Sequence, residues 1–441
     1  MGLIVGASGP VLARIGVTYP PAEPAVSPKV LPPAVMQAAD SGGLLTNWWL
    51  AHAVAALTLA LVGLLVWRSC RKRPSGPRWQ TYLTSLALTA GTVLTAMLTA
   101  LLYVNAASGF VPNVSAFMAL FDDGGGATSL GALAAAPAHP HTPGPPGRSR
   151  TVSRNHTGAS SGVVDLAPRP RVVSGPGTLV QVAIPDPALG VPVGLTDIYL
   201  PAGYAEQAGA GARYPVVYLV HGYPAGRASD WMVSGRAPQA LDALEAYGSA
   251  QSMVIVSVDA SGPSNGQDWE CLNTAGGPQL ETYLTRDVVA YVDGHLATRA
   301  HRGGRAIGGM SGGAFCALNL GLRHQDLYTA IMAIEPFDDP GGQALALLGG
   351  SITSWDANSP RLYLPTLHLR TPLTVYLADG SRSGSLPTAR RLAGEFERAG
   401  VTPLLQVIEG GGHEWTTARL ALPYALQAAS DVMSRPGHTS A

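Results

Sequence analysis

Two long apolar runs near the start of the chain constrain its fold more than any other feature. Residues 50–67 contain one ionisable side chain, His52, and residues 82–104 contain no charged residue. Each run is close to the roughly 20 residues that a helix needs to cross a bilayer. The sequence therefore predicts two transmembrane helices, and two buried core helices of a soluble protein are the alternative.

Aromatic and basic residues flank both runs. Side chains that favour the membrane–water interface stand near the ends of the runs: Trp48, Trp49, Trp67, Trp79 and Tyr103. The connection between the runs carries basic residues and no acidic one: Arg68, Arg71, Lys72, Arg73 and Arg78. Because short basic loops are retained in the cytoplasm, we expect this loop to be cytoplasmic and both termini to lie outside.

Bulk composition excludes several classes of protein. The chain has 441 residues and a formal net charge of zero, so it lacks the basic surface of a nucleic-acid-binding protein. Three cysteines are too few for a disulfide scaffold. The closest histidine pair, His139 and His141, lies in a Pro-rich stretch without a third ligand. We predict no metal and no cofactor.

Composition shifts divide the chain into four regions. Residues 1–46 form an extracytoplasmic segment that is a poor signal peptide, because it lacks a basic start and a clean cleavage site. Residues 47–105 hold the two membrane helices. Residues 106–174 form a Pro-, Gly- and Ser-rich linker that is expected to act as a tether. Within it, residues 110–121 are apolar and either lie on the membrane surface or dock on the C-terminal domain, residues 175–441.

The C-terminal domain alternates short β-rich runs with helical stretches. The β-rich runs are residues 179–184, 197–200, 215–220, 253–258, 328–334, 373–378 and 404–409. The helical stretches between the later runs are residues 238–247, 281–296, 313–324 and 387–399. This alternation predicts an α/β fold with a mostly parallel sheet and helices on both faces. The first two runs have little helix between them and indicate an antiparallel edge.

One of three Gly-x-Ser-x-Gly pentapeptides has the context of a nucleophilic serine. Such a serine needs a strand before it and a helix after it, whose N-terminal amides face the developing oxyanion. Ser160 lies in the linker, and Ser264 lies in a loop behind Pro263. Ser311 follows the short run 305–308 and precedes a good helix start. We interpret Ser311 as the nucleophile, with a structural Gly-rich turn as the alternative.

A general base is expected downstream of the nucleophile in this arrangement. His413 follows the run 404–409 through three glycines, which form a loop that can present an imidazole at the carboxyl edge of the sheet. The other downstream histidines lie at a helix end, before a strand and in the tail: His324, His368 and His438. We predict that His413 is the base, and an ordinary loop histidine is the alternative.

Several carboxylates could orient the base. Asp379 ends the run 373–378 and lies between nucleophile and base in the chain, so it is the preferred acid. Asp-Gly is also a common turn dipeptide, which leaves Asp338, Asp339 and Glu395 open as alternatives.

Two backbone N–H groups are expected to form an oxyanion hole. One belongs to Gly312, directly after the nucleophile. The other belongs to Tyr223 in the turn after residues 215–220, because the following Pro224 has no N–H. We interpret His221 in the same turn as a structural residue rather than a second base.

Together these motifs resemble those of the Putative esterase family of α/β-hydrolases, which includes esterase D-type enzymes, feruloyl esterases and mycobacterial mycolyltransferases. The resemblance covers residues from about 175 to the C-terminus. Its matching segments are His221-Gly222-Tyr223-Pro224 with Asp230-Trp231, Glu281-Thr282-Tyr283-Leu284-Thr285 with Asp287-Val288, Gly309-Met310-Ser311-Gly312-Gly313, and Gly412-His413-Glu414-Trp415.

The resemblance implies an α/β-hydrolase fold in which Ser311 and His413 act through an acyl-enzyme. It implies a serine esterase; an acyltransferase that acylates a sugar or lipid hydroxyl and a non-catalytic binding domain are the alternatives. Many family members carry an Asp a few residues after a strand-end Gly, where this chain has Ser381-Arg382-Ser383 after Gly380. In mycolyltransferases the acid is a Glu on the following helix, which keeps Glu395 open.

Membrane helices ahead of such a domain resemble those of actinobacterial members. We therefore expect a multi-pass membrane protein with an extracytoplasmic catalytic domain, whose partners are the bilayer and an ester or acyl-lipid substrate. The sequence assigns no oligomeric state. Cys70 lies in the basic loop, whereas Cys271 and Cys316 lie in the outer domain. We hypothesise that the latter pair forms a disulfide, which an oxidising compartment permits, and two free thiols are the alternative.

Overall fold

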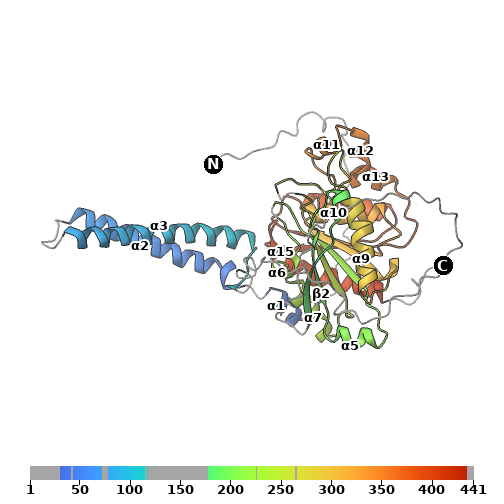
Figure 1. Ribbon diagram of the computed structural model, residues 1–441, viewed down its shortest axis with the longest axis horizontal. Helices are drawn as coiled ribbons and strands as arrows, with labels where there is room; N and C mark the ends of the chain where they lie inside the picture. Colours follow the sequence, from blue (N-terminus) through green and yellow to red (C-terminus); the bar gives the residue numbers. More distant parts are fainter. Residues whose placement is uncertain are drawn as a thin grey trace, which may run out of the picture.

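A helical hairpin and an α/β domain make up the described part of the chain (Figure 1). The computed structural model describes residues 30–40, 43–71, 78–114, 117, 177–224, 226–263 and 266–434. The hairpin consists of α2 (Trp48–Cys70) and α3 (Arg78–Ser108) and projects from one side of the domain. The domain carries every residue that the sequence analysis places in the candidate site.

One eight-stranded sheet organises the α/β domain. In spatial order its strands are β1 (Thr178–Ala183), β2 (Leu195–Leu200), β4 (Val254–Val258), β3 (Val216–Val220), β5 (Arg305–Met310), β6 (Ala330–Ile334), β7 (Thr374–Gly380) and β8 (Leu404–Ile408). β2 pairs antiparallel with β1 and β4, and every other neighbouring pair is parallel. The predicted mostly parallel sheet with an antiparallel edge is confirmed.

Helices cover both faces of the sheet, and its central strands are therefore buried on both sides. Alternate residues of β3 show this division: Tyr218 joins one hydrophobic cluster, and Val217 and Leu219 join another. The first cluster includes side chains of α9 (Val288–His295), α10 (Gly312–Arg323) and α14 (Leu386–Arg398). The second includes side chains of α7 (Ala237–Ala246) and α15 (Trp415–Met433).

The predicted helices of the domain are present, with one irregularity. The stretch 281–296 is built from α8 (Leu280–Thr282), a π-helical turn η5 (Tyr283–Asp287) and α9. The remaining helices of the domain are short and are not expected from the sequence pattern. These are η4 (Pro187–Leu189), α5 (Tyr204–Gly209), α6 (Asp230–Val233), η6 (Arg302–Gly304), α11 (Ala344–Leu347), α12 (Ile352–Ala357), α13 (Pro360–Tyr363) and η7 (Leu364–Thr366).

The two hairpin helices are long and apolar enough to cross a membrane. The candidate spans are Trp48–Cys70 and Trp79–Ser108, with mean hydropathies of 2.2 and 1.8. Only 6% of each apolar window is buried in protein, unlike the core helix of a soluble domain. The helices contact each other through Thr58 and Thr99, whose hydroxyl oxygens lie 3.2 Å apart.

The N-terminal region is more ordered than the sequence analysis predicts. The short helix α1 (Pro33–Asp40), followed by η2 (Leu44–Thr46), packs against α7 and α15 through the buried side chains of Val35 and Ala39. Residues 106–108 continue α3, although the linker was expected to begin at residue 106. Residues 115, 116 and 118–174 of that linker lie outside the described residues, and these include His139 and His141.

Candidate active site

Ser311 occupies a sharp turn between the end of β5 and the start of α10. Its backbone φ is 58°, in the left-handed region that typically costs a non-glycine residue about 1–3 kcal/mol. The N-terminal amides of α10 begin immediately after it. A strained strand-to-helix turn of this kind is the geometry in which α/β-hydrolases present a nucleophilic hydroxyl.

Two glycines allow the strand and the helix to approach closely at this turn. A Cβ at Gly309 would lie 2.1 Å from the Gly313 carbonyl oxygen, and a Cβ at Gly313 would lie 2.2 Å from the Val220 carbonyl oxygen. Both obstructions are backbone atoms, so neither can rotate away. Packing therefore requires glycine at these two positions of the pentapeptide.

We expect Gly313→Ala to lower the free energy of unfolding by about 1–3 kcal/mol or more, because the new methyl group must push against β3. Urea unfolding of the full-length chain measures the effect. Gly294→Ala in α9 is the control, since nothing lies within 4 Å of the added Cβ and alanine favours a helix. Equal destabilisation by both substitutions would contradict the close approach.

His413 contacts the predicted nucleophile directly. The loop between β8 and α15 carries it, and its Nε2 lies 2.9 Å from Ser311 Oγ. Burial lowers the pKa of His413 below its usual value, and the negative charge of Asp379 opposes that effect. The imidazole is therefore held in the neutral form that can accept the Ser311 proton.

Asp379 lies close enough to His413 for its negative charge to act on the imidazole. It is the next-to-last residue of β7 and is fully buried, and its Oδ1 accepts a 2.8 Å hydrogen bond from the Gly380 N–H. Among the described residues its Oδ2 has no hydrogen-bond partner. Burial raises the pKa of Asp379, and the nearby hydroxyl groups of Ser383 and Ser385 partly oppose that effect. Ser385 Oγ lies 3.3 Å from His413 Nδ1, a contact that could not be read from the sequence.

The three rival acids form ion pairs with arginines. Asp338 accepts a 2.8 Å hydrogen bond from Arg391, and Asp339 lies 2.8 Å from Arg361. Glu395 accepts a 2.6 Å hydrogen bond from the Arg398 guanidinium. Of the four carboxylates considered, Asp379 is the one whose charge acts on His413.

Glu335 is a buried carboxyl group that the sequence analysis did not consider. It follows β6 directly, has a φ of 56°, and its Oε1 accepts a 2.9 Å hydrogen bond from the Glu414 N–H. Burial raises the pKa of Glu335 well above its ordinary value, and the nearby Asp379 adds to the shift. The sequence signal that could have found Glu335 is its place as an ionisable residue directly after the apolar strand β6. Glu335 fixes the backbone next to His413.

The predicted oxyanion groups lie beside each other. A Cβ built on Gly312 would lie 3.9 Å from the Tyr223 backbone nitrogen. The preceding His221 is buried and joins two loops: its Nδ1 lies 2.8 Å from the Gly222 carbonyl oxygen, and its Nε2 accepts a 2.9 Å hydrogen bond from the Ala260 N–H. These contacts agree with the interpretation of His221 as a structural turn residue.

A small cleft of about 30 Å³ opens beside the oxyanion turn. Asp268 and Glu270 form part of its wall, and burial together with the charge of Asp268 raises the pKa of Glu270 to about 9. Glu270 therefore carries a proton at neutral pH. A disulfide between Cys271 and Cys316 joins this wall to α10, with the two Cα atoms 5.6 Å apart. The predicted disulfide is confirmed.

The other histidines and serines considered in the sequence analysis lie away from this dyad or outside the described residues. His324, at the end of α10, has a carboxylate partner, because its Nε2 lies 2.8 Å from Glu281 Oε1. The two decoy serines and the tail histidine are outside the described part of the chain: Ser160, Ser264 and His438. Among the described residues, no cluster of three His, Cys, Asp or Glu side chains could hold a metal ion.

The strand order, the strained turn at Ser311 and the close approach of His413 define a domain of the α/β-hydrolase class. Residues 195–429, more than half of the chain, match the family model described as "Putative esterase". The chain belongs to this family, as the motif resemblance implies.

Two curated proteins resemble parts of the chain. An uncharacterised protein of Corynebacterium glutamicum is 26% identical over 235 residues, which are 51% of this chain and 54% of that protein. An endo-1,4-beta-xylanase/feruloyl esterase of Xylanibacter ruminicola is 29% identical over 133 residues, which are 30% of this chain and 18% of that protein. The chain spans about half or less of the length of these relatives.

Solved structures share the fold of the domain. A ferulic acid esterase superposes with a TM-score of 0.50 and 23% identity, covering 59% of this chain and 100% of that chain. An S-formylglutathione hydrolase from Agrobacterium tumefaciens superposes with a TM-score of 0.51 and 16% identity, covering 60% and 99%. At these identities the likeness establishes the α/β-hydrolase fold alone.

Proposed function

We propose that the chain is a serine esterase that hydrolyses carboxylic esters through an acyl-enzyme on Ser311. The observation that carries the proposal is the 2.9 Å contact between Ser311 Oγ and His413 Nε2, because a serine hydroxyl needs an adjacent neutral base to become a nucleophile. Membership of the Putative esterase family supports the same chemistry.

The proposed mechanism has two halves. In the first, His413 Nε2 takes the Ser311 proton while Oγ attacks the ester carbonyl carbon. The N–H groups of Tyr223 and Gly312 stabilise the negative oxygen, and the imidazolium returns its proton to the departing alcohol. In the second, His413 takes a proton from the water that attacks the acyl-Ser311 carbonyl carbon. The bond between that carbon and Oγ breaks, the imidazolium returns the proton to Ser311 Oγ, and the acid product leaves.

Asp379 is the proposed acid of the triad, because it is the carboxylate whose charge acts on His413. The Ser385 hydroxyl, 3.3 Å from His413 Nδ1, can accept the Nδ1–H, which leaves Nε2 free to face Ser311. This tautomer is the one required of a general base. The negative charge of Asp379 also stabilises the imidazolium that forms during the reaction.

We also propose that the hairpin crosses the cell membrane twice and holds the domain outside the cytoplasm. The apolar windows of α2 and α3 support the two spans. The basic residues between the helices support a cytoplasmic loop. The Cys271–Cys316 disulfide supports an oxidising, extracytoplasmic location for the domain. The similarity to a Corynebacterium protein is in keeping with an actinobacterial source.

A panel of p-nitrophenyl esters of increasing acyl length tests the esterase activity of the full-length chain in detergent. We expect release of p-nitrophenol that Ser311→Ala abolishes. A sugar alcohol added in excess separates hydrolysis from acyl transfer, because a transferase forms an acylated sugar in place of free acid. Wild-type protein that releases no p-nitrophenol above the Ser311→Ala background contradicts the proposal.

A further inference from the structure

The chain contacts the α/β domain on both sides of the hairpin, before α2 and after α3. Before α2, helix α1 packs on α7 and α15 and buries Leu31, Val35 and Ala39. After α3, the Gly109 and Phe110 carbonyls accept hydrogen bonds from the domain. A helix pair held at both ends cannot rotate freely about either connection.

The contacts after α3 are specific and buried. Arg419, which is 1% exposed, donates from Nη1 to the carbonyl oxygens of Gly109 and Ser234 at 2.7 and 2.9 Å. Ser234 Oγ donates to the Phe110 carbonyl oxygen at 2.6 Å. Gly109 has a φ of 64°, and a Cβ there would lie 2.5 Å from Thr416 Oγ1. The chain therefore needs glycine at the point where it meets α15.

Asn105 ties the two ends of the hairpin to each other. Its Nδ2 donates to the carbonyl oxygens of Leu45 and Val111 at 2.8 and 2.9 Å, and its Oδ1 accepts from the Val111 N–H at 2.8 Å. Leu45 N–H also donates to the Pro112 carbonyl oxygen. The hairpin and its two connections thus form one hydrogen-bonded junction.

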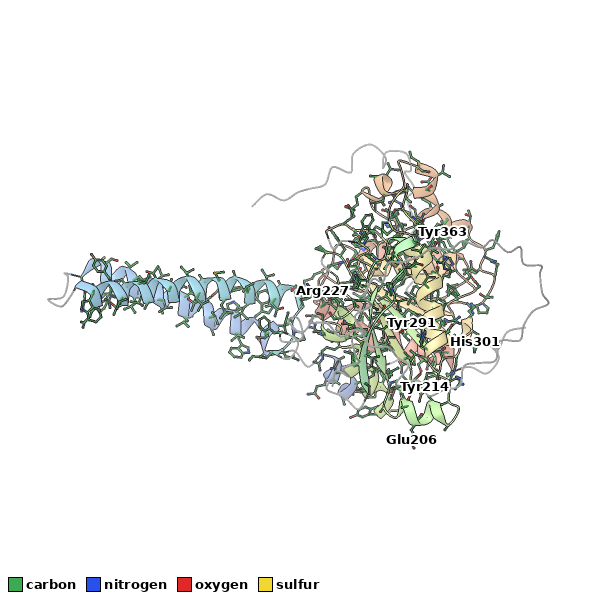
Figure 2. All side chains as sticks on the ribbon, in the orientation of Figure 1. Glu206, Tyr214, Arg227, Tyr291, His301 and Tyr363 are labelled. Carbon is green, nitrogen blue, oxygen red and sulfur yellow. A yellow bond between two sulfur atoms is a disulfide. The ribbon has the colours of Figure 1, made fainter. Side chains whose placement is uncertain are left out.

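The junction lies next to both loops of the catalytic site. The Phe110 ring packs edge-on to Trp415, two residues after His413, with ring centroids 6.3 Å apart. Trp415 packs on Trp231, and the Trp231 Nε1–H donates at 2.8 Å to Val220, at the strand end before the oxyanion turn. Arg227, in the loop after that turn, lies at the domain edge nearest the hairpin (Figure 2).

The membrane surface implied by the hairpin lies close to this junction. Along α3, about 36 Å separate Trp79 from Tyr103, which is near the thickness of a bilayer core. Tyr103 packs with Trp48 at the same end of the hairpin, with ring centroids 5.9 Å apart, as expected of an interfacial aromatic belt. Only about 8 Å of helix then remains between Tyr103 and the end of α3 at Ser108.

Exposed aromatic side chains flank the catalytic dyad. Tyr223, beside the oxyanion turn, is 41% exposed, and Phe337 is 44% exposed with its ring 5.7 Å from the His413 ring. Aromatic groups at the mouth of a site held near a bilayer can contact an acyl chain as it leaves the lipid phase. This feature matches an ester that carries a long apolar chain.

We propose that the two-point junction fixes the catalytic cleft at the outer bilayer surface, and that the enzyme takes amphiphilic acyl esters from that bilayer. The inference rests on the esterase function and the membrane anchoring proposed above. It assigns the hairpin a role in substrate access, beyond retention of the domain at the membrane.

The test uses the full-length chain in phosphatidylcholine vesicles and two esters with one leaving group. p-Nitrophenyl acetate is water-soluble, and p-nitrophenyl palmitate partitions into the bilayer. A variant carries a Gly/Ser insertion after Asp40 and another after Ser108, each of about ten residues and spanning roughly 17 Å on average. The same insertion after Gly211, an exposed residue in the turn that follows α5, is the control.

We expect the double insertion to lower palmitate turnover roughly tenfold through the fall in effective concentration at the bilayer, while acetate turnover is unchanged. Equal turnover of palmitate by the wild type and the double insertion overturns the inference. Equal loss of both esters also overturns it, since the junction would then act on catalytic geometry. Wild-type protein that hydrolyses neither ester removes the proposed esterase function itself, a distinguishable failure.

Discussion

Replacement of Ser311 by alanine is expected to lower kcat for ester hydrolysis by roughly four to six orders of magnitude. The substitution removes the atom that attacks the carbonyl carbon and leaves His413, 2.9 Å away, without a hydroxyl to deprotonate. The oxyanion N–H groups and the cleft remain, so KM should change little. Initial-rate kinetics on the full-length chain measure both constants.

Ser354→Ala is the matched control for this substitution. Ser354 lies in α12, and its hydroxyl donates to Ser351 Oγ at 2.9 Å, far along the chain from the dyad. We expect Ser354→Ala to retain the wild-type kcat. We also expect Ser354→Ala and Ser311→Ala to have the same thermal unfolding midpoint. If Ser311→Ala kept more than a small fraction of wild-type turnover, another residue would have to be the nucleophile.

Asp379→Asn is expected to have the second largest effect, a fall in kcat of roughly 10³- to 10⁴-fold. The amide carries no negative charge to stabilise the imidazolium that forms on His413 during the reaction. Glu395→Gln is the control among the rival acids, because Glu395 pairs with Arg398. A large loss in Glu395→Gln with little loss in Asp379→Asn would assign the acid to α14.

The pH dependence of kcat/KM provides a second readout of the same substitution. Neutral His413 is the active form, and its pKa lies below the usual histidine value, so wild-type activity should fall only below about pH 6.5. The charge of Asp379 raises the pKa of His413. Its removal must therefore move the acid limb to still lower pH, and a limb that moves upward would contradict the assignment.

The fold and the dyad could be predicted because their signals are local. Central strands such as β3 and β6 are uninterrupted apolar runs, since parallel strands are buried on both faces. Ser311 was distinguished from two other pentapeptide serines by the strand before it and the helix after it. His413 could be predicted as the base because the base comes after the nucleophile in the chain and because the glycine loop after β8 can present an imidazole.

The position of Asp379 in the chain could be predicted, but its surroundings could not, because they are set by packing between β7 and the loop before α14. Ser385 is an ordinary serine in the sequence, and only the fold brings it to 3.3 Å from His413 Nδ1. Glu335 was missed for the same reason. Its carboxyl group accepts a hydrogen bond from the Glu414 N–H, 79 positions away in the chain.

The junction between the hairpin and the domain could not be predicted from local patterns. Phe110 and Arg419 are separated by most of the chain, and the Pro-rich composition between residues 106 and 174 indicates a tether. The buried guanidinium of Arg419 and the left-handed Gly109 show a fixed contact at its start. Composition averages over a segment and does not register a contact made by two of its residues.

The most direct test of the account is covalent labelling of the full-length chain with a fluorophosphonate, followed by peptide mapping. Such a probe phosphonylates a serine only where a base and an oxyanion hole activate it. The account predicts one adduct, on the peptide that contains Ser311, and its loss in both Ser311→Ala and His413→Ala. An unlabelled wild-type protein, or an adduct that persists in Ser311→Ala, would contradict it.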